Sequence, residues 1–523
     1  MEILNSFSSF FIKVRKTFFL DINEKLYVNS FNNKIEKNKI PKKNILYSAT
    51  ESYYPLCFSH LLSKEKKYKE SKFIFYLPEL AFYNLDPKKN LLIFIFKFYY
   101  KNLILVLRNK KWKRLYKTQS ANFVSLNNFN IFKEIKNLKK ASIIRRKIKN
   151  VKDLIKFSYK DINVGNLIYD TYLRFNNSAT LKFNDFLIIE IIAKVINSYE
   201  KLKILKKKNK ISEYYSNQLS YMQHGFIAKF FLKEKLPVNF TGAKGAYITK
   251  YKKQNYIHAF DFRKFRSHFK KLKNKRDKLL QAKKLLKVKF SGKIIPQENW
   301  MLFSAYNHSN LDFKLKKFKV IIFLHCFVDS PTARGKFLFL DFAEWINKTL
   351  EYFRDKNLSE YVAIKPHPHG KSASKIYVEE LKRKYSDFQW INERVPNNFI
   401  FSKRPIIGLS VLGTVLPELA FHNIIPIACG THYSMSYDFV FTPKTIENYF
   451  KLIELGLRKK LKLPRNYKSQ IYEYYYCDFI YDHPNNANLF AKKILLKNWN
   501  LSNNEYNNGT ELKKYILKMQ SFF

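Results

Sequence analysis

The sequence predicts an α/β protein whose C-terminal half contains a parallel β-sheet. Between residues 320 and 430, β-branched apolar runs alternate with amphipathic helical patterns. Such alternation builds a parallel sheet through right-handed crossovers. The chain has 523 residues, of which 46% are hydrophobic, which is enough for two or three domains, each with its own core. Its 49 Phe and 36 Tyr residues exclude intrinsic disorder as the state of the whole chain.

The N-terminal half alternates apolar and basic segments. We expect a polar-basic helical extension over residues 1–40 and a strand followed by a turn at 44–50. Two apolar runs follow at 73–83 and 90–100, and a strand-like run at 103–107. We expect a Lys-rich solvated helix or connection at 133–160 and an amphipathic helix at 187–208. Short strands are expected at 247–251 and 256–262, and a Lys-rich helix at 264–287 is expected to connect two lobes.

The C-terminal half has the clearer pattern. Its strands are expected at 320–325, 361–368, 405–410 and 424–430, and its helices at 339–356, 376–385 and 414–422. The continuous apolar run at 320–325 is typical of a strand buried on both faces. Ligands of such sheets bind beyond the carboxyl ends of the strands, and the polar residues of this region gather there.

Polar residues follow these strands in succession, and each has a functional and a structural interpretation. These residues are His325, Asp329, Lys365, His367, Ser410, Gly413, Thr414 and Glu418. The Lys and the two His residues suit a phosphate or a catalytic role, the Gly-Thr pair opens a helix whose N–H groups suit an anion, and the Glu suits ribose hydroxyls. The alternatives are a surface Lys in a turn, an ordinary N-cap and a Glu that complements the helix dipole.

Two clusters stand out in the N-terminal half. The segment GNLIYDTYLR, residues 165–174, brings together Tyr169, Asp170 and Arg174, and His224 precedes a glycine at the start of an apolar helix. Asp170 and His224 are candidates for a general base, which must reach the hydroxyl that it deprotonates. A structural ion pair between Asp170 and Arg174 is the alternative.

The formal net charge of +56 first suggests nucleic acid or an anionic membrane surface. However, only 16 of the 97 basic residues are Arg, and Arg is the better residue for recognising phosphates and bases. The favoured residues Lys, Asn, Ile, Phe and Tyr share A/T-rich codons, so genome composition is the competing cause. We therefore expect nucleic acid not to be the partner and keep an anionic membrane surface as a candidate.

Other features bear on location. The four Cys residues are far apart and form no CxxC pair, as expected in a reducing compartment. The apolar run from Leu91 to Tyr100 is too short to span a bilayer, and the basic residues near the N-terminus follow its apolar patch, unlike in a signal peptide. We expect a cytoplasmic protein, soluble or peripheral on the inner face of the membrane.

The motifs GNLIYDTYLR, QHG, HCFVDSP, IKPHPHG and GLSVLGTVLPELAFHNIIPIACG together resemble bacterial capsule and surface-polysaccharide biosynthesis proteins of the glycosyltransferase-B type, over about residues 160–480. The KPHP and GT-x-x-x-E features are also similar to those of capsule Kdo transferases and bacterial sialyltransferases. The resemblance implies an α/β fold of two Rossmann-like lobes with a ligand cleft between them, plus helical extensions. The expected parts are a helical extension (1–40), an acceptor-side lobe (41–290), a nucleotide-binding lobe (291–462) and a helical tail (463–523).

The resemblance also implies site roles. Lys365, His367, Ser410 and Thr414 bind the donor phosphate, and Glu418 binds the donor ribose or base. Asp170 or His224 is then the base, with Tyr169 and Arg174 on the acceptor side. The expected function is transfer of a sugar from a nucleotide-sugar, with a CMP-linked sugar as one candidate, to a glycan or lipid-linked glycan acceptor.

The resemblance further implies that no metal or other cofactor is needed, because in such enzymes helix N-termini and basic side chains stabilise the leaving phosphate. The alternatives are a CDP-polyol phosphotransferase of teichoic-acid-like polymer synthesis and a basic nucleic-acid-binding protein. A scaffold derived from the same family is a further alternative.

Overall fold

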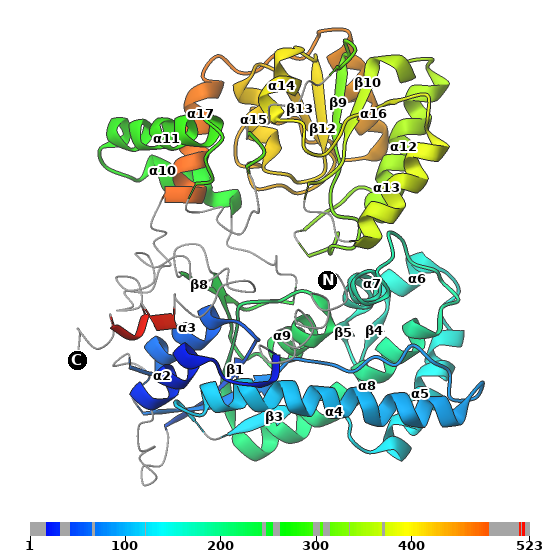
Figure 1. Ribbon diagram of the computed structural model, residues 1–523, viewed down its shortest axis with the longest axis vertical. Helices are drawn as coiled ribbons and strands as arrows, with labels where there is room; N and C mark the ends of the chain where they lie inside the picture. The colour runs from blue at the N-terminus through cyan, green and yellow to red at the C-terminus, as the bar shows by residue number, and fades with distance from the viewer. Residues whose placement is uncertain are drawn as a thin grey trace, which may run out of the picture. The chain divides into compact units, whose positions relative to one another are not determined.

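The chain folds into two compact units, shown in Figure 1. The first unit contains residues 1–171, 182–256 and 484–523, and the second contains 172–181 and 257–483. This computed structural model describes residues 17–31, 42–64, 68, 70–120, 122–242, 247–254, 262–295, 304–306, 314–333, 335–368, 372–480, 512–513 and 515–517. Most of the extension expected at 1–40, most of the strand expected at 256–262 and much of the tail expected at 463–523 lie outside these residues.

The first unit is built on a six-stranded sheet. The strand order is β3-β2-β1-β6-β7-β8, and all neighbouring strands are parallel except β7 and β8. The bounds are β1 Lys43–Ser48, β2 Ser71–Leu77, β3 Phe123–Ser125, β6 Ile211–Ser216, β7 Val238–Gly242 and β8 Tyr247–Tyr251. The order reverses between β1 and β6, as in doubly wound sheets.

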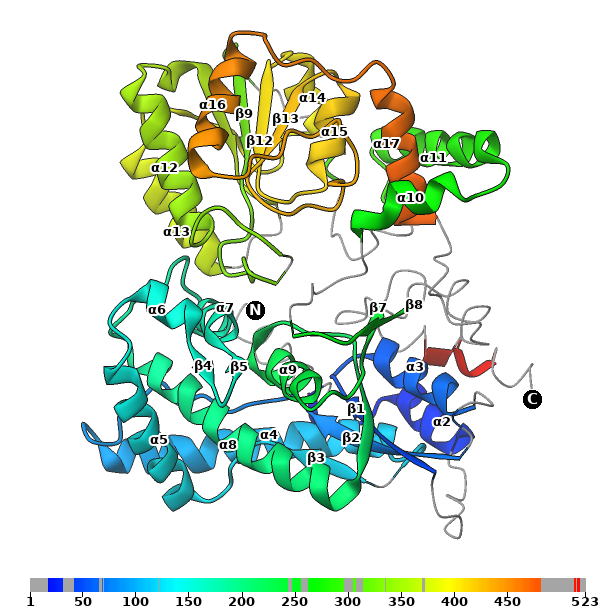
Figure 2. The ribbon, with the colours of Figure 1, turned by 180° about the vertical axis from the view of Figure 1, so that it is seen from behind.

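Helices cover both faces of this sheet. In Figures 1 and 2, α2, α3 and α4 lie on one side and α8 and α9 on the other. The helices are α2 Ile22–Ser30, α3 Tyr53–Lys64, α4 Leu91–Tyr116, α5 Ile131–Arg146, α6 Val151–Lys156, α7 Gly165–Asn176, α8 Phe186–Asn209 and α9 Phe226–Lys233. A two-stranded antiparallel sheet joins β4 Ser158–Tyr159 to β5 Ile162–Asn163. The amphipathic helix expected at 187–208 is confirmed as α8.

The apolar segments at 90–100 and 103–107 differ from expectation. They form one continuous helix, α4, and the strand-like interpretation of 103–107 is wrong. The Asn90 side chain caps the helix by accepting a hydrogen bond from the Ile93 N–H. Phe94, Phe98 and Leu105 then form a buried row with the helical spacing. Apolar residues on the opposite face hide this period in the sequence.

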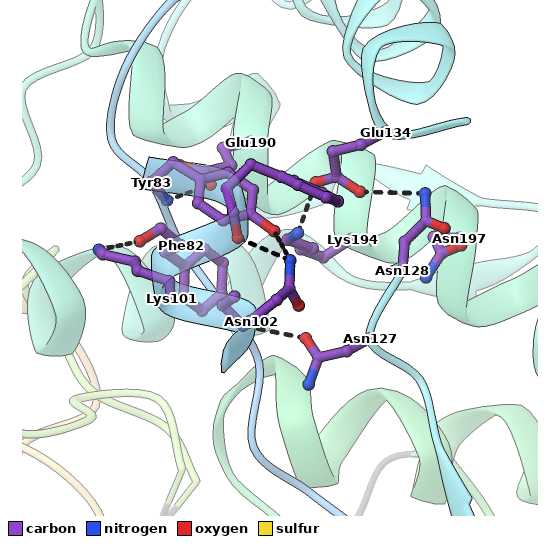
Figure 3. A network of polar contacts seen from close by, with 12 residues as sticks. Phe82, Tyr83, Lys101, Asn102, Asn127, Asn128, Glu134, Glu190, Lys194 and Asn197 are labelled. Carbon is purple, nitrogen blue, oxygen red and sulfur yellow. Dashed lines mark hydrogen bonds and ion pairs between the residues drawn. The ribbon is translucent and has the colours of Figure 1, made fainter. Parts of the chain in front are cut away.

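A buried polar network holds the loop that follows β2 in the first unit (Figure 3). The Glu190 carboxylate on α8 accepts hydrogen bonds from the N–H groups of Tyr83 and Asn84, the second at 2.8 Å. One turn further along α8, Lys194 forms an ion pair with Glu134 of α5. The side chains of both ion-pair partners are 1% exposed. The Lys-rich segment 133–160 therefore contributes a packed helix, α5, as well as solvated side chains.

The second unit contains the parallel sheet that the sequence predicts. Its strand order is β11-β10-β9-β12-β13, and all neighbours are parallel. The strands are β9 Val320–Phe323, β10 Val362–Lys365, β11 Gln389–Trp390, β12 Ile407–Ser410 and β13 Ile425–Ala428. The helices around it are α12 Phe342–Asp355, α13 Ser372–Lys384, α14 Asn397–Ser402, α15 Val415–Phe421 and α16 Ile446–Leu457.

Helix α12 illustrates why these segments are helical. The Asp341 side chain caps it by accepting a hydrogen bond from the Glu344 N–H at 2.8 Å, which satisfies one of the free N–H groups of the first turn. Its apolar residues Phe342, Trp345, Ile346 and Phe353 are buried in the core of the second unit. The predicted amphipathic stripe is thus the face that packs on the sheet.

The boundary between the units lies at Tyr256, whereas the sequence places it near residue 290. Helices α10 (Phe265–Lys270) and α11 (Lys275–Phe290) belong to the second unit, because both pack on α17 (Tyr467–Tyr475). The expected tail is also divided. Helix α17 is part of the second unit, while Tyr515 is buried in the core of the first. Among the described residues, no helix is both long and apolar enough to cross a membrane.

Candidate functional site

A cavity of about 360 Å³ opens at the carboxyl ends of the strands of the second unit. Strand register aligns these ends, because Phe323 lies opposite Lys365 and Ile322 lies opposite both Ile364 and Leu409. The strand order reverses between β9 and β12, so the cavity occupies the switch point where doubly wound sheets bind ligands. All eight donor-site residues predicted from the sequence line it: His325, Asp329, Lys365, His367, Ser410, Gly413, Thr414 and Glu418.

Lys365 is one of two buried lysines that line this cavity, and Lys289 is the other. Lys365 ends β10, its residue is 3% exposed, and its Nζ donates hydrogen bonds to the Val395 carbonyl and the Asn397 Oδ1, both at 2.7 Å. Burial lowers the pKa of Lys365 to about 8, and the charge of Glu418 opposes that shift. An ammonium group has three protons, and two of them fix the side chain in place.

The two histidines lie near each other. The ring centroids of His325 and His367 are 6.0 Å apart, and the His325 ring also lies 4.6 Å from that of Phe342. His367 follows the rigid Lys365-Pro366 step at the end of β10, and His325 follows β9. Both rings are partly exposed, as a ligand contact requires.

The loop that carries Asp329 is held in place by α13. The Phe327 N–H donates a hydrogen bond to the Ser374 Oγ at 3.0 Å. Asp329 accepts a hydrogen bond from the Ser330 N–H at 2.9 Å. This contact orients the carboxylate locally, so the side chain has a structural role in addition to lining the cavity.

The β12–α15 turn forms another part of the cavity wall. Ser410 is buried, and its hydroxyl donates a hydrogen bond to the Phe323 carbonyl at 3.4 Å. A Cβ atom added to Gly413 would lie 3.0 Å from the Ser410 Oγ, so glycine leaves that hydroxyl room. Thr414 precedes α15 but makes no capping hydrogen bond through its side chain. Thr414 thus occupies the N-cap position of α15 without the side-chain hydrogen bond of an ordinary N-cap.

Glu418 lines the cavity but is already bonded to protein groups. Its Oε2 accepts a 2.6 Å hydrogen bond from the Tyr306 hydroxyl, and its Oε1 lies 2.9 Å from the Nζ of Lys289 on α11. Glu418, Lys289 and Tyr306 are all at least 95% buried. The geometry favours Glu418 as a structural anchor of the cavity wall over the helix-dipole role.

Three residues of this site were not predicted from the sequence. Lys289 and Tyr306 hold Glu418, and Asn397 holds Lys365. Lys289 lies in a Lys-rich helix without a distinguishing motif. Asn397 follows a proline at the start of α14, and this is the one local signal that marks it.

In the first unit, His224 lies at the other switch point. It belongs to a π-helical turn, Tyr221–Gly225, and its Nδ1 is 3.3 Å from the Oγ of Ser48, the last residue of β1. The turn begins at Tyr221 with φ +59°, a left-handed conformation that non-glycine residues adopt at a cost. Burial lowers the pKa of His224 to about 3, so the imidazole is neutral at pH 7.

The candidates on α7 are divided between the units. Tyr169 and Asp170 are buried in the first unit, whereas Arg174 belongs to the second, because the boundary falls after Thr171. Helix α7 contacts the His224 turn through a 2.8 Å hydrogen bond from the Met222 N–H to the Thr171 Oγ1.

The described residues contain no group of three or more His, Cys, Asp or Glu side chains that could hold a metal ion. No protein-family model and no curated protein sequence matches the chain. Among solved structures, the chain is similar to the N-terminal domain of Candida albicans trehalose-6-phosphate phosphatase, with 10% sequence identity and a TM-score of 0.30. The match covers 89% of this chain and 98% of that domain.

Proposed function

We propose that the protein is a glycosyltransferase of surface-polysaccharide synthesis that binds a nucleotide-sugar donor in the second unit. The observation that carries this proposal is the cavity at the switch point of β9 and β12, lined by Lys365, His367, Ser410 and Thr414. Nucleotide phosphates bind at this position of doubly wound sheets. A CMP-linked sugar is the first donor to test, because of the His-Pro and Gly-Thr motifs.

The chemistry of the cavity suits a departing phosphate. In the proposed reaction, the acceptor oxygen forms a bond to the anomeric carbon while the bond from that carbon to the nucleotide phosphate oxygen breaks. The electron pair of the broken bond stays on the phosphate. The Lys365 ammonium, held by two acceptors, and the Thr414 hydroxyl stabilise this charge. The Ser410 hydroxyl adds to this once its proton turns from the Phe323 carbonyl to the phosphate.

The first unit supplies the acceptor side in this proposal. We take His224 as the base candidate over Asp170 because its ring lies beside Ser48 at the end of β1. Both residues are buried, His224 at 6% and Asp170 at 1% exposure. The hydroxyl proton of the acceptor then passes to the neutral imidazole. The low pKa of His224 means that it gains basicity only when substrate binding brings a compensating negative charge near it.

Thermal shift measurements with CMP, CDP, UDP and their sugar or polyol conjugates test the donor site. Wild type should be stabilised by one nucleotide class, and His367→Ala and Thr414→Val should lose that stabilisation while they keep the melting temperature of the free protein. Lys356→Ala is the control, because this exposed residue at the end of α12 does not line the cavity. It should respond like wild type.

The outcomes separate the candidate functions. Stabilisation by CMP supports the CMP-sugar donor, and stabilisation by CDP-polyols alone supports the polyol phosphotransferase. No response of wild type to any nucleotide overturns the transferase proposal. An equal loss in Lys356→Ala places the nucleotide elsewhere and overturns the assignment of this cavity.

A further inference from the structure

The outward face of α4 carries a continuous row of large apolar side chains. Leu92 is 80% exposed, Phe96 is 69% exposed and Leu103 is 57% exposed. Tyr99, Tyr100, Val106 and Leu107 extend the same row. The spacing of three or four residues places all of them on one side of the helix. Figure 1 shows α4 along its full length at the outer side of the first unit.

This row is separate from the packed face of the helix. Phe94 and Phe98 are fully buried, and both rings pack against Tyr83 with ring centroids 5.4 Å apart. The inward face thus anchors α4 to the unit. Isolated exposed apolar residues need no explanation, but a contiguous row indicates an interaction surface.

The charged residues of α4 also differ between the inward and the outward face of the helix. The helix contains seven Lys and Arg residues and no Asp or Glu. Basic residues that face the unit are paired: Arg108 with Glu51, and Lys111 with Glu24 at 2.8 Å. The outward basic residues at the end of the row are exposed and form no salt bridge with any residue that the structure describes. They are Lys110, Lys113 and Arg114.

We propose that α4 is a membrane-interface helix that lies flat on an anionic lipid surface. The apolar row from Leu92 to Leu107 is about 23 Å long and enters the boundary between headgroups and acyl chains, while Lys110, Lys113 and Arg114 contact lipid phosphates. The helix lies on the bilayer and does not cross it, because its other face is part of the protein core. The exposed Tyr side chains suit the headgroup level.

The partner is chosen by charge and shape. Helix α4 has no acidic residues, and it combines an aromatic apolar row with a cluster of exposed cations. These features complement a surface that is apolar inside and negative outside. The same helix of a second copy of this chain would bring no acidic side chain to the contact, so it offers no charge complement to Lys110, Lys113 and Arg114. The proposal concerns location and acceptor access, so it stands independently of the donor cavity.

Vesicle sedimentation tests this surface. Vesicles of phosphatidylcholine alone are compared with vesicles in which phosphatidylglycerol replaces part of it. The full-length variants are Leu92→Ser/Phe96→Ser/Leu103→Ser and Lys110→Gln/Lys113→Gln/Arg114→Gln. The control is Lys283→Gln/Lys284→Gln/Lys287→Gln, which removes the same charge from exposed positions of α11.

Wild type should bind the anionic vesicles much more tightly than vesicles of phosphatidylcholine alone. Three basic residues each contribute about 1 kcal/mol near such a surface, so the basic α4 variant should bind about 100-fold more weakly. The apolar variant should lose the part of the binding that resists high salt, and the α11 control should bind like wild type. All variants should keep the nucleotide response of wild type, so a failure here is distinguishable from a failure of the donor site.

Three results would overturn the proposal. One is absence of wild-type binding to anionic vesicles. Another is equal weakening in the α4 basic variant and the α11 control, which would make the binding a property of total charge. The third is loss of self-association, with no change in lipid binding, in the apolar variant, which would assign the row to a second copy of the chain.

Discussion

The Lys289–Glu418 ion pair predicts a large stability cost for a single substitution at the donor cavity. In Lys289→Met, the Glu418 carboxylate stays buried at 3% exposure and loses the cation that lies 2.9 Å away. The Tyr306 hydroxyl bond and the attraction of the Lys365 charge do not replace this direct contact of a buried charge. Removing one partner of a buried pair costs about 3–5 kcal/mol.

This loss of free energy of unfolding predicts a measurable fall in the melting temperature. For a unit of roughly 240 residues, 1 kcal/mol corresponds to about 2–4 °C, so the transition of the second unit should fall by about 6–20 °C. Scanning calorimetry of the full chain measures it. The double variant Lys289→Met/Glu418→Gln should recover much of the loss, because the carboxamide keeps the Tyr306 contact and carries no charge.

The same experiment decides the role of Glu418. If Glu418 served only a ligand, the free protein would tolerate Lys289→Met, and its melting temperature would stay within about 2 °C of wild type. That result, or a double variant that is less stable than the single one, would refute the anchor role that we derive from the geometry.

Three further predictions follow from buried groups. Because burial lowers the pKa of Lys365 to about 8, the affinity for a nucleotide should fall up to about tenfold per pH unit above pH 8. Calorimetric titration at pH 7 and pH 9 measures this fall in affinity. An equal fall in Lys365→Met would contradict the assignment to Lys365. Burial raises the pKa of Glu190 to about 7, so the folded state binds the proton of this carboxyl group more tightly than the unfolded state does. The protonated carboxyl group therefore contributes stability below pH 4.5, and this stability is lost as the pH rises through 7. Glu190→Gln should therefore remove a decline of roughly 3 kcal/mol between pH 4.5 and 7 in urea unfolding, and an unchanged profile would argue against it. In Gly225→Ala, the new Cβ would lie 2.5 Å from the Leu167 Cδ2, so overpacking should lower the free energy of unfolding by about 1–3 kcal/mol; a variant as stable as wild type would show that the turn relaxes.

The second unit shows why its site was accessible from sequence. Residues 320–323 are β-branched or aromatic and fully packed, so the strand pattern had no competing interpretation. Once the strands are parallel, their carboxyl ends meet at one edge, and residues as distant as His325 and Thr414 line one cavity. The order of the strands could not be predicted in this way, because β11 has only two residues.

Other features left no local signal. Lys289 is one of 81 Lys residues, and only its packing against Glu418 distinguishes it. In α4, exposed apolar residues on the outward face made one helix resemble two separate apolar runs, because they replace the polar half of the amphipathic pattern. The boundary at Tyr256 depends on the contacts of α10 and α11 with α17. Helix α17 follows these two helices by about 200 residues of sequence, and contacts over such a distance leave no local signal.

The discontinuous composition of the first unit has a consequence for its synthesis on the ribosome. The hydroxyl of Tyr515 lies 3.1 Å from the Nδ1 of His60, across 455 residues of chain, and Leu512 and Ile516 join the same core. Domains generally fold in the order of translation, but here the second unit emerges whole before the last segment of the first unit does. The core of the first unit therefore stays incomplete until the end of translation. Chains that lose residues 512–517 should expose this core, so chaperones or proteases should recognise them through their N-terminal half.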